Sequence, residues 1–226
     1  RTNGKPRGGG VVLFAGFHAA CAVALFQRWG GPVTGEITPS LWLVTLAVSA
    51  AFLCMGLASD AFDLPLWAWG SGQLVCGTLA FGLGLRFGDA LGISLPLGVE
   101  FALTVLWFCM IVTAFKLIDG MDGLATGLAA IAALGIAGAL SVRHLPLDVL
   151  ILLGLIGTCI GFLRYNKSPA RILLGDSGSL FLGSVLATVS LLTASKSATI
   201  ASIGVPVLAM GVPLFDTLLT IWRRGV

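Results

Sequence analysis

The chain has 226 residues, of which 57% are hydrophobic and only 10% are charged, and its mean hydropathy is +1.02. Soluble domains carry about 25% charged residues, so this composition excludes a soluble globular domain and predicts an integral membrane protein. The formal net charge of +3 is small, and no nucleic-acid partner is expected.

Eight apolar runs each come close to the ~20 residues that a helix needs to cross a bilayer. They predict an all-α fold, a polytopic membrane bundle of about eight transmembrane helices, built as one domain over residues 1–226. The chain does not begin with Met and stops just after an Arg-Arg pair, which favours a piece truncated at both ends. The expected spans are residues 11–29, 41–58, 67–87, 95–115, 124–142, 147–163, 179–194 and 200–222.

The charged residues indicate how the bundle is oriented. With eight spans, the face that holds the N-terminus carries nine Lys and Arg residues and the other face carries four. Cytoplasmic loops carry the excess of Lys and Arg, so the first face is predicted to be cytoplasmic. Six of the ten acids fall on or near that face, which favours an active site at the cytoplasmic surface: Asp60, Asp63, Asp119, Asp122, Asp176 and Asp216.

The segment KLIDGMDGLATG, residues 116–127, carries the strongest functional signal. It places Asp119 and Asp122 at the end of an apolar run, three residues apart, and a helix would present both on one face. Gly120 and Gly123 leave the backbone bare beside each acid, where a ligand can approach closely. A polar loop is the simpler interpretation of one acid, but two acids with three glycines favour a site.

A second segment, RYNKSPARILLGDSGSLFLG, covers residues 164–183. In it, Asp176 and Ser177 precede a stretch of small residues and an apolar helix, whose first backbone N–H groups suit an anion. A membrane helix that is simply capped by a serine is the alternative interpretation.

Two weaker segments are expected at the same face. KPRGGG, residues 5–10, places Lys5 and Arg7 before three glycines that permit a tight, exposed turn. GLASDAFDL, residues 56–64, places Asp60 at the inner end of the second span. Basic residues before a span and an interfacial turn are the simpler interpretations of these two segments.

Several carboxylates and several cations on one face suit a phosphorylated substrate with a divalent metal. Mg²⁺ prefers oxygen ligands and commonly uses one or two carboxylates together with substrate phosphates. The metal neutralises the charge between phosphates, and Lys or Arg holds their oxygens.

At these four segments the chain resembles the polyprenyl-phosphate N-acetylhexosamine-1-phosphate transferases of glycosyltransferase family 4. This superfamily contains undecaprenyl-phosphate GlcNAc-1-phosphate transferases and the phospho-MurNAc-pentapeptide transferase of peptidoglycan synthesis. The resemblance is collinear over nearly the whole chain and is most specific in LIDGMDGLA and PARILLGDSGSLFLG. PRGGG and PLFDTLLTIWRR support it, and the GDSGSLFLG form and the Asp216 segment look more like the GlcNAc branch.

The resemblance implies an enzyme of EC 2.7.8 type in the bacterial cytoplasmic membrane. Undecaprenyl phosphate would attack the β-phosphate of a UDP-N-acetylhexosamine, giving a polyprenyl-diphospho-sugar and UMP for cell-wall or surface-polysaccharide synthesis. Mg²⁺ is the implied cofactor, with Mn²⁺ as the alternative. The partners are these two substrates and the lipid bilayer, and the oligomeric state stays open, with a homodimer as one candidate.

The resemblance also assigns roles by position. Asp60 and Asp119 look like catalytic acids, the first near the lipid phosphate and the second near the diphosphate and ribose. Asp176 looks like the metal ligand. Substrate contacts are implied for Lys5, Arg7, Gly120, Asp122 and Leu173.

Three positions depart from the family pattern. Ser59 stands where the family usually has a first Asp, and a lipid phosphate is already largely ionised, so losing that acid would slow the reaction rather than abolish it. Thr113 and Lys116 stand where the family tends to have Asn. Thr113 is a poorer metal ligand, whereas Lys116 either helps to hold the diphosphate or displaces the metal.

Two alternatives stay open. A catalytically degenerate relative would bind nucleotide-sugar or lipid without turnover, as the three departures suggest. A secondary transporter would need ionisable groups near the bilayer midplane at broken helices, but the acids are expected at one face and His18 is nearly alone inside a span.

Overall fold

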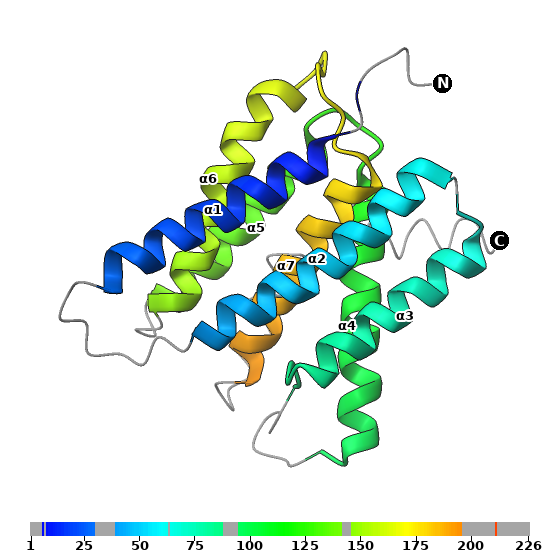
Figure 1. The fold of residues 1–226 in the computed structure, drawn as a ribbon, viewed down its shortest axis with the longest axis vertical. Helices are drawn as coiled ribbons and strands as arrows, with labels where there is room; N and C mark the ends of the chain where they lie inside the picture. The colour runs from blue at the N-terminus through cyan, green and yellow to red at the C-terminus, as the bar shows by residue number, and fades with distance from the viewer. Residues whose placement is uncertain are drawn as a thin grey trace.

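The computed structural model describes residues 6, 8–29, 39–62, 64–87, 95–141, 146–195 and 211. Every regular element within these ranges is an α-helix, which confirms the all-α prediction (Figure 1). The helices are α1 (Gly9–Trp29), α2 (Pro39–Phe62), α3 (Leu66–Gly82), α4 (Leu97–Ile118), α5 (Leu124–Ser141), α6 (Pro146–Asn166) and α7 (Gly175–Ser195).

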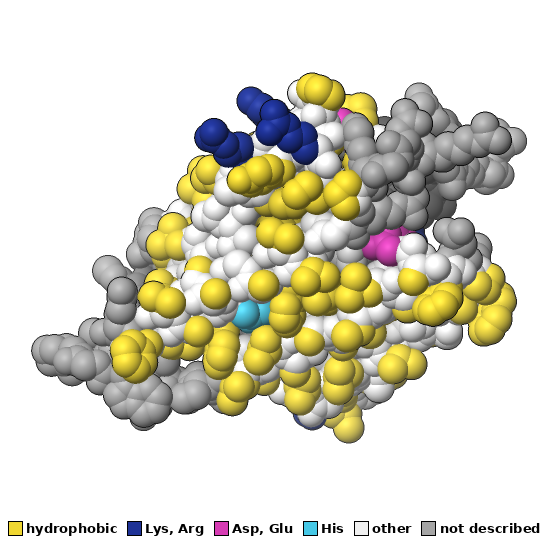
Figure 2. All heavy atoms as spheres, turned by 45° about the horizontal axis from the view of Figure 1, so that its top comes forward, with side chains coloured by type: hydrophobic (Ala, Val, Ile, Leu, Met, Phe, Trp, Pro, Cys, Tyr) yellow, Lys and Arg dark blue, Asp and Glu magenta, His cyan; other side chains and the backbone are white. Residues whose placement is uncertain are grey.

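Five of these helices are long and apolar enough to cross a membrane: α1, α2, α4, α6 and α7. The other two helices, α3 and α5, are shorter. The structure therefore describes one helix fewer than the eight expected, and the expected span at residues 200–222 lies outside the described residues except for Gly211. Hydrophobic side chains cover much of the face shown in Figure 2, as a surface in contact with acyl chains requires.

Helix α7 lies at the centre of the bundle. In its apolar window, Gly175–Leu192, 83% of the residues are buried, against 33–50% in the other four spans. In Figure 1 it runs between the group formed by α1, α5 and α6 and the group formed by α2, α3 and α4. The N-terminal end of α7 is therefore surrounded by other helices, and that end carries Asp176.

Glycines on the neighbouring helices let their backbones approach the start of α7. A Cβ atom at Gly56 of α2 would lie 2.4 Å from the Cα atom of Ser177, and one at Gly10 of α1 would lie 2.5 Å from the Ser177 carbonyl carbon. Small residues permit such close approach between membrane helices. These contacts hold the first turn of α7 in a fixed position against α1 and α2.

Several helix boundaries differ from the predicted ones, and three of the differences bear on the site. Helix α2 continues to Phe62, so Asp60 lies in its last turn rather than in a loop. Helix α7 begins at Gly175, so Asp176 belongs to its first turn. Gly9 and Gly10 begin α1 and are buried, so the prediction of an exposed glycine turn there is wrong. Hydropathy marks the apolar part of a helix and misses polar turns at its ends.

Candidate active site

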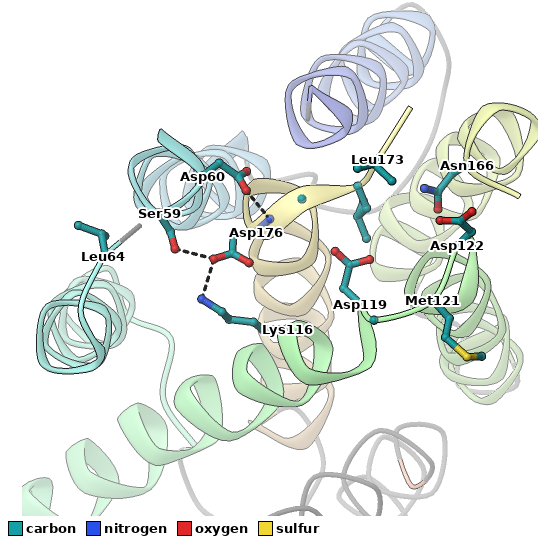
Figure 3. Close-up of a pocket in the computed structure, with 13 residues that line it drawn as sticks. Ser59, Asp60, Leu64, Lys116, Asp119, Met121, Asp122, Asn166, Leu173 and Asp176 are labelled. Carbon is teal, nitrogen blue, oxygen red and sulfur yellow. Dashed lines mark hydrogen bonds and ion pairs between the residues drawn. The ribbon is translucent and has the colours of Figure 1, made fainter. Parts of the chain in front are cut away.

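A pocket of about 490 Å³ opens at the end of the bundle where α7 begins (Figure 3). Its walls come from the C-terminal ends of α2, α4 and α6, from the segments that join α2 to α3, α4 to α5 and α6 to α7, and from the start of α7. It is lined by Ser59, Asp60, Leu64, Lys116, Asp119, Gly120, Met121, Asp122, Asn166, Leu173, Leu174, Gly175 and Asp176.

Six of the eight predicted site residues line this one pocket: Asp60, Asp119, Gly120, Asp122, Leu173 and Asp176. The other two, Lys5 and Arg7, lie outside the described residues, as does Asp63. Sequence reasoning missed Leu64, Met121, Asn166, Leu174 and Gly175. Only Asn166 carried a signal, because it is a polar residue that ends an apolar run.

The carboxylate of Asp176 has two partners on the same oxygen. Its Oδ2 atom accepts a hydrogen bond from Ser59 Oγ at 2.5 Å and pairs with Lys116 Nζ at 2.6 Å. Figure 3 shows both side chains pointing at Asp176 from α2 and α4. Two of the three departures from the family pattern, Ser59 and Lys116, therefore meet on one oxygen of the acid predicted to bind the metal.

The ammonium group of Lys116 is held from a second side by an aromatic ring. Its Nζ atom lies 4.5 Å from the centre of the Trp69 ring of α3, within the range of a cation–π interaction. The side chains of Lys116 and Asp176 are 27% and 28% exposed, so the ion pair is partly open to the pocket. A ligand entering the pocket can therefore reach a lysine whose position is already fixed.

Asp60 binds the start of α7 from the neighbouring helix. Its two carboxylate oxygens accept the backbone N–H groups of Asp176 and Ser177, each at 3.0 Å. The first N–H groups of a helix have no partner within the helix, and a carboxylate there also interacts favourably with the helix dipole. Gly175 has φ +73°, and a Cβ atom there would lie 2.8 Å from Asp60 Oδ2, so glycine makes this approach possible.

This geometry predicts that Asp60→Ala lowers the free energy of unfolding by about 1–2 kcal/mol, the typical cost of losing a helix cap. Asp60→Asn should lose much less, because its amide oxygen can still accept one of the two N–H groups. Denaturation of the purified protein in detergent, followed by circular dichroism, measures both. An Asn variant that is as unstable as the Ala variant would contradict the capping role.

Asp119 ends α4 as its C-terminal capping residue, and its carboxylate accepts no hydrogen bond from the described residues. In Figure 3 it lies between Asp176 and Asp122. Burial, and then the negative charges of Asp176, Asp60 and Asp122, raise the pKa of Asp119 to about 8. A carboxyl group in this position favours its protonated form unless a cation lies beside it.

Asp122 lies in a turn that joins α4 to α5, so the predicted helical arrangement of Asp119 and Asp122 on one face is wrong. Gly123 has φ +78°, a conformation that glycine adopts without strain and that ends the possibility of one continuous helix. The Asp122 Oδ2 atom accepts the backbone N–H of Ala170 at 2.9 Å. Asp122 therefore supports the loop between α6 and α7, which forms one wall of the pocket.

Four more hydrogen bonds fix that loop and its neighbours. The side chain of Asn166 donates to the carbonyl of Ile172 at 3.1 Å and accepts from the Thr126 hydroxyl at 3.1 Å. The backbone of Leu173 bonds to the N-terminal segment in both directions, donating to the Pro6 carbonyl at 3.1 Å and accepting from the Gly9 N–H at 3.2 Å. Pro6 and Gly9 are thus attached directly to a residue that lines the pocket.

The carboxylates of this pocket fit a divalent cation of the kind that takes part of its ligands from a substrate. No group of three or more His, Cys, Asp or Glu side chains within the described ranges is arranged to hold a metal by itself. Mg²⁺ commonly uses only one or two carboxylates together with phosphates. Asp119 and the Oδ1 atom of Asp176 accept no hydrogen bond from the described chain, which leaves carboxylate oxygens for such an ion.

Thr113, the third departure, takes no part in the pocket lining. Its hydroxyl oxygen lies 3.3 Å from the side-chain oxygen and 3.4 Å from the side-chain nitrogen of Gln73 on α3, within hydrogen-bonding distance of each. The structure therefore gives Thr113 a partner on a neighbouring helix.

Fold and site together define a multi-pass helical membrane protein with an acidic, lysine-bearing pocket at one end of the bundle. The model of a protein family described as glycosyl transferase family 4 matches residues 42–194, which is more than half of the chain. The chain belongs to this family, as the sequence motifs predicted.

Three relatives show how the similarity is distributed. The chain is 34% identical over 228 residues to the probable undecaprenyl-phosphate N-acetylglucosaminyl 1-phosphate transferase of Bacillus subtilis, covering 97% of this chain and 60% of that protein. It is 30% identical over 246 residues to the decaprenyl-phosphate N-acetylglucosaminephosphotransferase of Mycobacterium tuberculosis, with the same coverage.

The third relative belongs to the other branch. The chain is 35% identical over 218 residues to the phospho-N-acetylmuramoyl-pentapeptide-transferase of Desulforudis audaxviator, covering 85% of this chain and 64% of that protein. The chain thus spans about 60% of the length of these relatives.

Proposed function

We propose that the complete protein transfers N-acetylhexosamine-1-phosphate from a UDP-sugar to undecaprenyl phosphate. GlcNAc-1-phosphate is the proposed group. An oxygen of the lipid phosphate attacks the β-phosphorus of the UDP-sugar. The bond from the β-phosphorus to the oxygen bridging the two phosphates breaks, and UMP leaves with that oxygen. The observation that carries the proposal is one pocket in which Asp60, Asp119, Lys116 and Asp176 meet.

The residues of the pocket suit this reaction in separate ways. Lys116 offers a fixed positive charge for the diphosphate, because Asp176 and Trp69 already hold its ammonium group. Asp60 holds the start of α7 in place, which positions Asp176. The uridine is expected near Gly120, Asp122 and Leu173, which line the wall nearest to the loop between α6 and α7.

Mg²⁺, or Mn²⁺ in its place, is part of the proposal. Asp176 and Asp119 would hold it, and it would supply neutralisation of the charge that develops between the phosphates. Mg²⁺ beside Asp119 would offset the partial burial and the three neighbouring acids that raise the pKa of this carboxyl group to about 8.

The proposed setting is the cytoplasmic face of a bacterial cytoplasmic membrane, in cell-wall or surface-polysaccharide synthesis. Bacterial relatives of both branches support the setting, and the excess of Lys and Arg at the expected cytoplasmic loops supports the orientation. The preference for GlcNAc rests on the GDSGSLFLG segment and on the segment that contains Asp216. For the oligomeric state, we propose a homodimer as the first assembly to test.

A second candidate is a relative that binds the nucleotide-sugar or the lipid without turnover. The observation that favours it is the occupied Oδ2 atom of Asp176, which already pairs with Lys116 and Ser59. An internal cation at this position can replace the metal that turnover requires.

A transfer assay separates the two candidates. The complete protein is incubated with sugar-labelled UDP-GlcNAc, undecaprenyl phosphate and Mg²⁺, and label is counted in the extracted lipid. We expect lipid-linked label that depends on both substrates and disappears with a chelator. Binding of UDP-GlcNAc without any lipid-linked label would support the degenerate relative instead.

A further inference from the structure

A second charged cavity lies on the loop that joins α6 to α7. It has a volume of about 420 Å³ and is lined by Arg164, Tyr165, Lys167, Ser168, Pro169 and Arg171. Its three cations come from eight consecutive residues, and their side chains are exposed. On the face of the molecule drawn in Figure 2, Lys and Arg side chains (dark blue) gather at one end, apart from the larger patch of Asp and Glu (magenta).

These three cations have no acidic partner in the part of the chain that the structure describes. The ion pair within the described ranges joins Lys116 to Asp176, and both residues line the acidic pocket. Asp122 reaches this loop, but its carboxylate accepts the backbone N–H of Ala170. The cavity therefore presents positive charge that suits an anionic group such as a phosphate.

An apolar groove continues from this cavity along the bundle. It has a volume of about 740 Å³, lies between α1 and α6, and shares Arg164 and Tyr165 with the basic cavity. Gly157 and Gly161 line it, and a Cβ atom at either position would meet no atom within 4 Å. A glycine inside a helix is destabilising relative to alanine, and nothing in the described chain fills the space that these two leave open.

The two cavities together have the shape and charge of a site for a lipid with an anionic headgroup. We propose that an anionic glycerophospholipid of the surrounding bilayer binds here, with its phosphate on Arg164, Lys167 and Arg171 and an acyl chain over Gly157 and Gly161. Basic pockets between membrane helices on the cytoplasmic side bind such headgroups. Helix α6 is long and apolar enough to cross a membrane over residues 149–166, and Arg164 lies in the last turn of this segment, where lipid headgroups are expected.

This site is distinct from the pocket of the proposed reaction. The residues that line the two lipid cavities include none of those that line the acidic pocket. The proposal therefore does not depend on the transferase activity, and a lipid bound here is not the lipid that reacts.

A second copy of the chain is the competing occupant, since two glycines four residues apart are typical of close contacts between membrane helices. Such a helix would fill the apolar groove but would leave the three cations without a partner. A lipid accounts for both cavities at once, and for this reason we commit to it.

The test measures lipid binding to the complete purified protein by native mass spectrometry. The probes are phosphatidylglycerol, phosphatidylcholine with the same acyl chains, and undecaprenyl phosphate. The variants are the triple change Arg164→Gln, Lys167→Gln, Arg171→Gln and the groove change Gly161→Leu. The matched controls are Arg86→Gln, an exposed arginine elsewhere on the bundle, and Gly98→Leu, where a Cβ atom also meets nothing.

We expect phosphatidylglycerol to bind in preference to phosphatidylcholine and the triple variant to lose roughly 100-fold in affinity, at about fivefold for each cation removed. Gly161→Leu should weaken binding of both phospholipids, and neither control should change it. Equal binding of the two phospholipids, or an unchanged triple variant, would overturn the proposal. So would a dimer that Gly161→Leu dissociates without bound lipid, or displacement of phosphatidylglycerol by equimolar undecaprenyl phosphate.

Discussion

Replacing Lys116 by methionine is expected to lower kcat/KM for UDP-GlcNAc by roughly 10- to 100-fold, the effect of losing one hydrogen bond to a charged group. Methionine keeps an unbranched stem of similar length that still packs beside Trp69, but it removes the ammonium group that the diphosphate would meet. Stability should change by less than about 1 kcal/mol, because the ion pair is partly exposed and such pairs contribute little.

The metal dependence gives this variant a second readout. With the ammonium group gone, the carboxylate of Asp176 is less neutralised, so the Mg²⁺ concentration for half-maximal rate should fall. Arg86→Met is the matched control, since Arg86 lines none of the three cavities and its cation also lies 4.5 Å from the centre of an aromatic ring, that of Phe81. If kcat/KM and the metal requirement both match those of the unaltered protein, Lys116 does not act on the diphosphate.

Replacing Asp176 by asparagine is expected to reduce turnover by at least about 100-fold, the usual effect of removing one group that stabilises the transition state. Asparagine fills the same volume, and the contact of Asp60 with the start of α7 is made to backbone N–H groups that the substitution leaves in place. The fold should therefore survive, and the loss should fall on the chemistry.

The measurement for Asp176→Asn is the rate of label transfer as a function of Mg²⁺ concentration, together with the melting temperature. The control is Ser59→Ala, which removes the other partner of the same Asp176 oxygen without changing its charge. An Asp176→Asn protein whose rate responds to Mg²⁺ as the unaltered protein does would remove Asp176 from the metal site.

Much of the site was predictable because its residues fall within recognisable sequence motifs. The order of apolar runs predicted that Asp60, Asp119 and Asp176 lie at one end of the bundle, and the structure brings all three to one pocket. This part depends on the number of spans between the motifs, which hydropathy records well. The family could also be recognised, because LIDGMDGLA and PARILLGDSGSLFLG are long and specific.

The partners of each side chain were not predictable. Ser59 and Lys116 were singled out separately, but their meeting on one oxygen of Asp176 depends on how α2, α4 and α7 pack. The contact of the Asp60 carboxylate with the backbone of α7, between residues 116 positions apart, was not predicted. No local pattern encodes such a contact, because it arises only when helices that are distant in sequence approach each other.

The central claim is that this pocket transfers the sugar together with the β-phosphate of its donor. The most direct test uses two preparations of UDP-GlcNAc, one labelled at the β-phosphorus and one at the α-phosphorus, with undecaprenyl phosphate as acceptor. We expect β-label to enter the lipid fraction together with the sugar and α-label to appear in UMP. Release of both phosphates as UDP, or sugar in the lipid fraction without β-label, would contradict it.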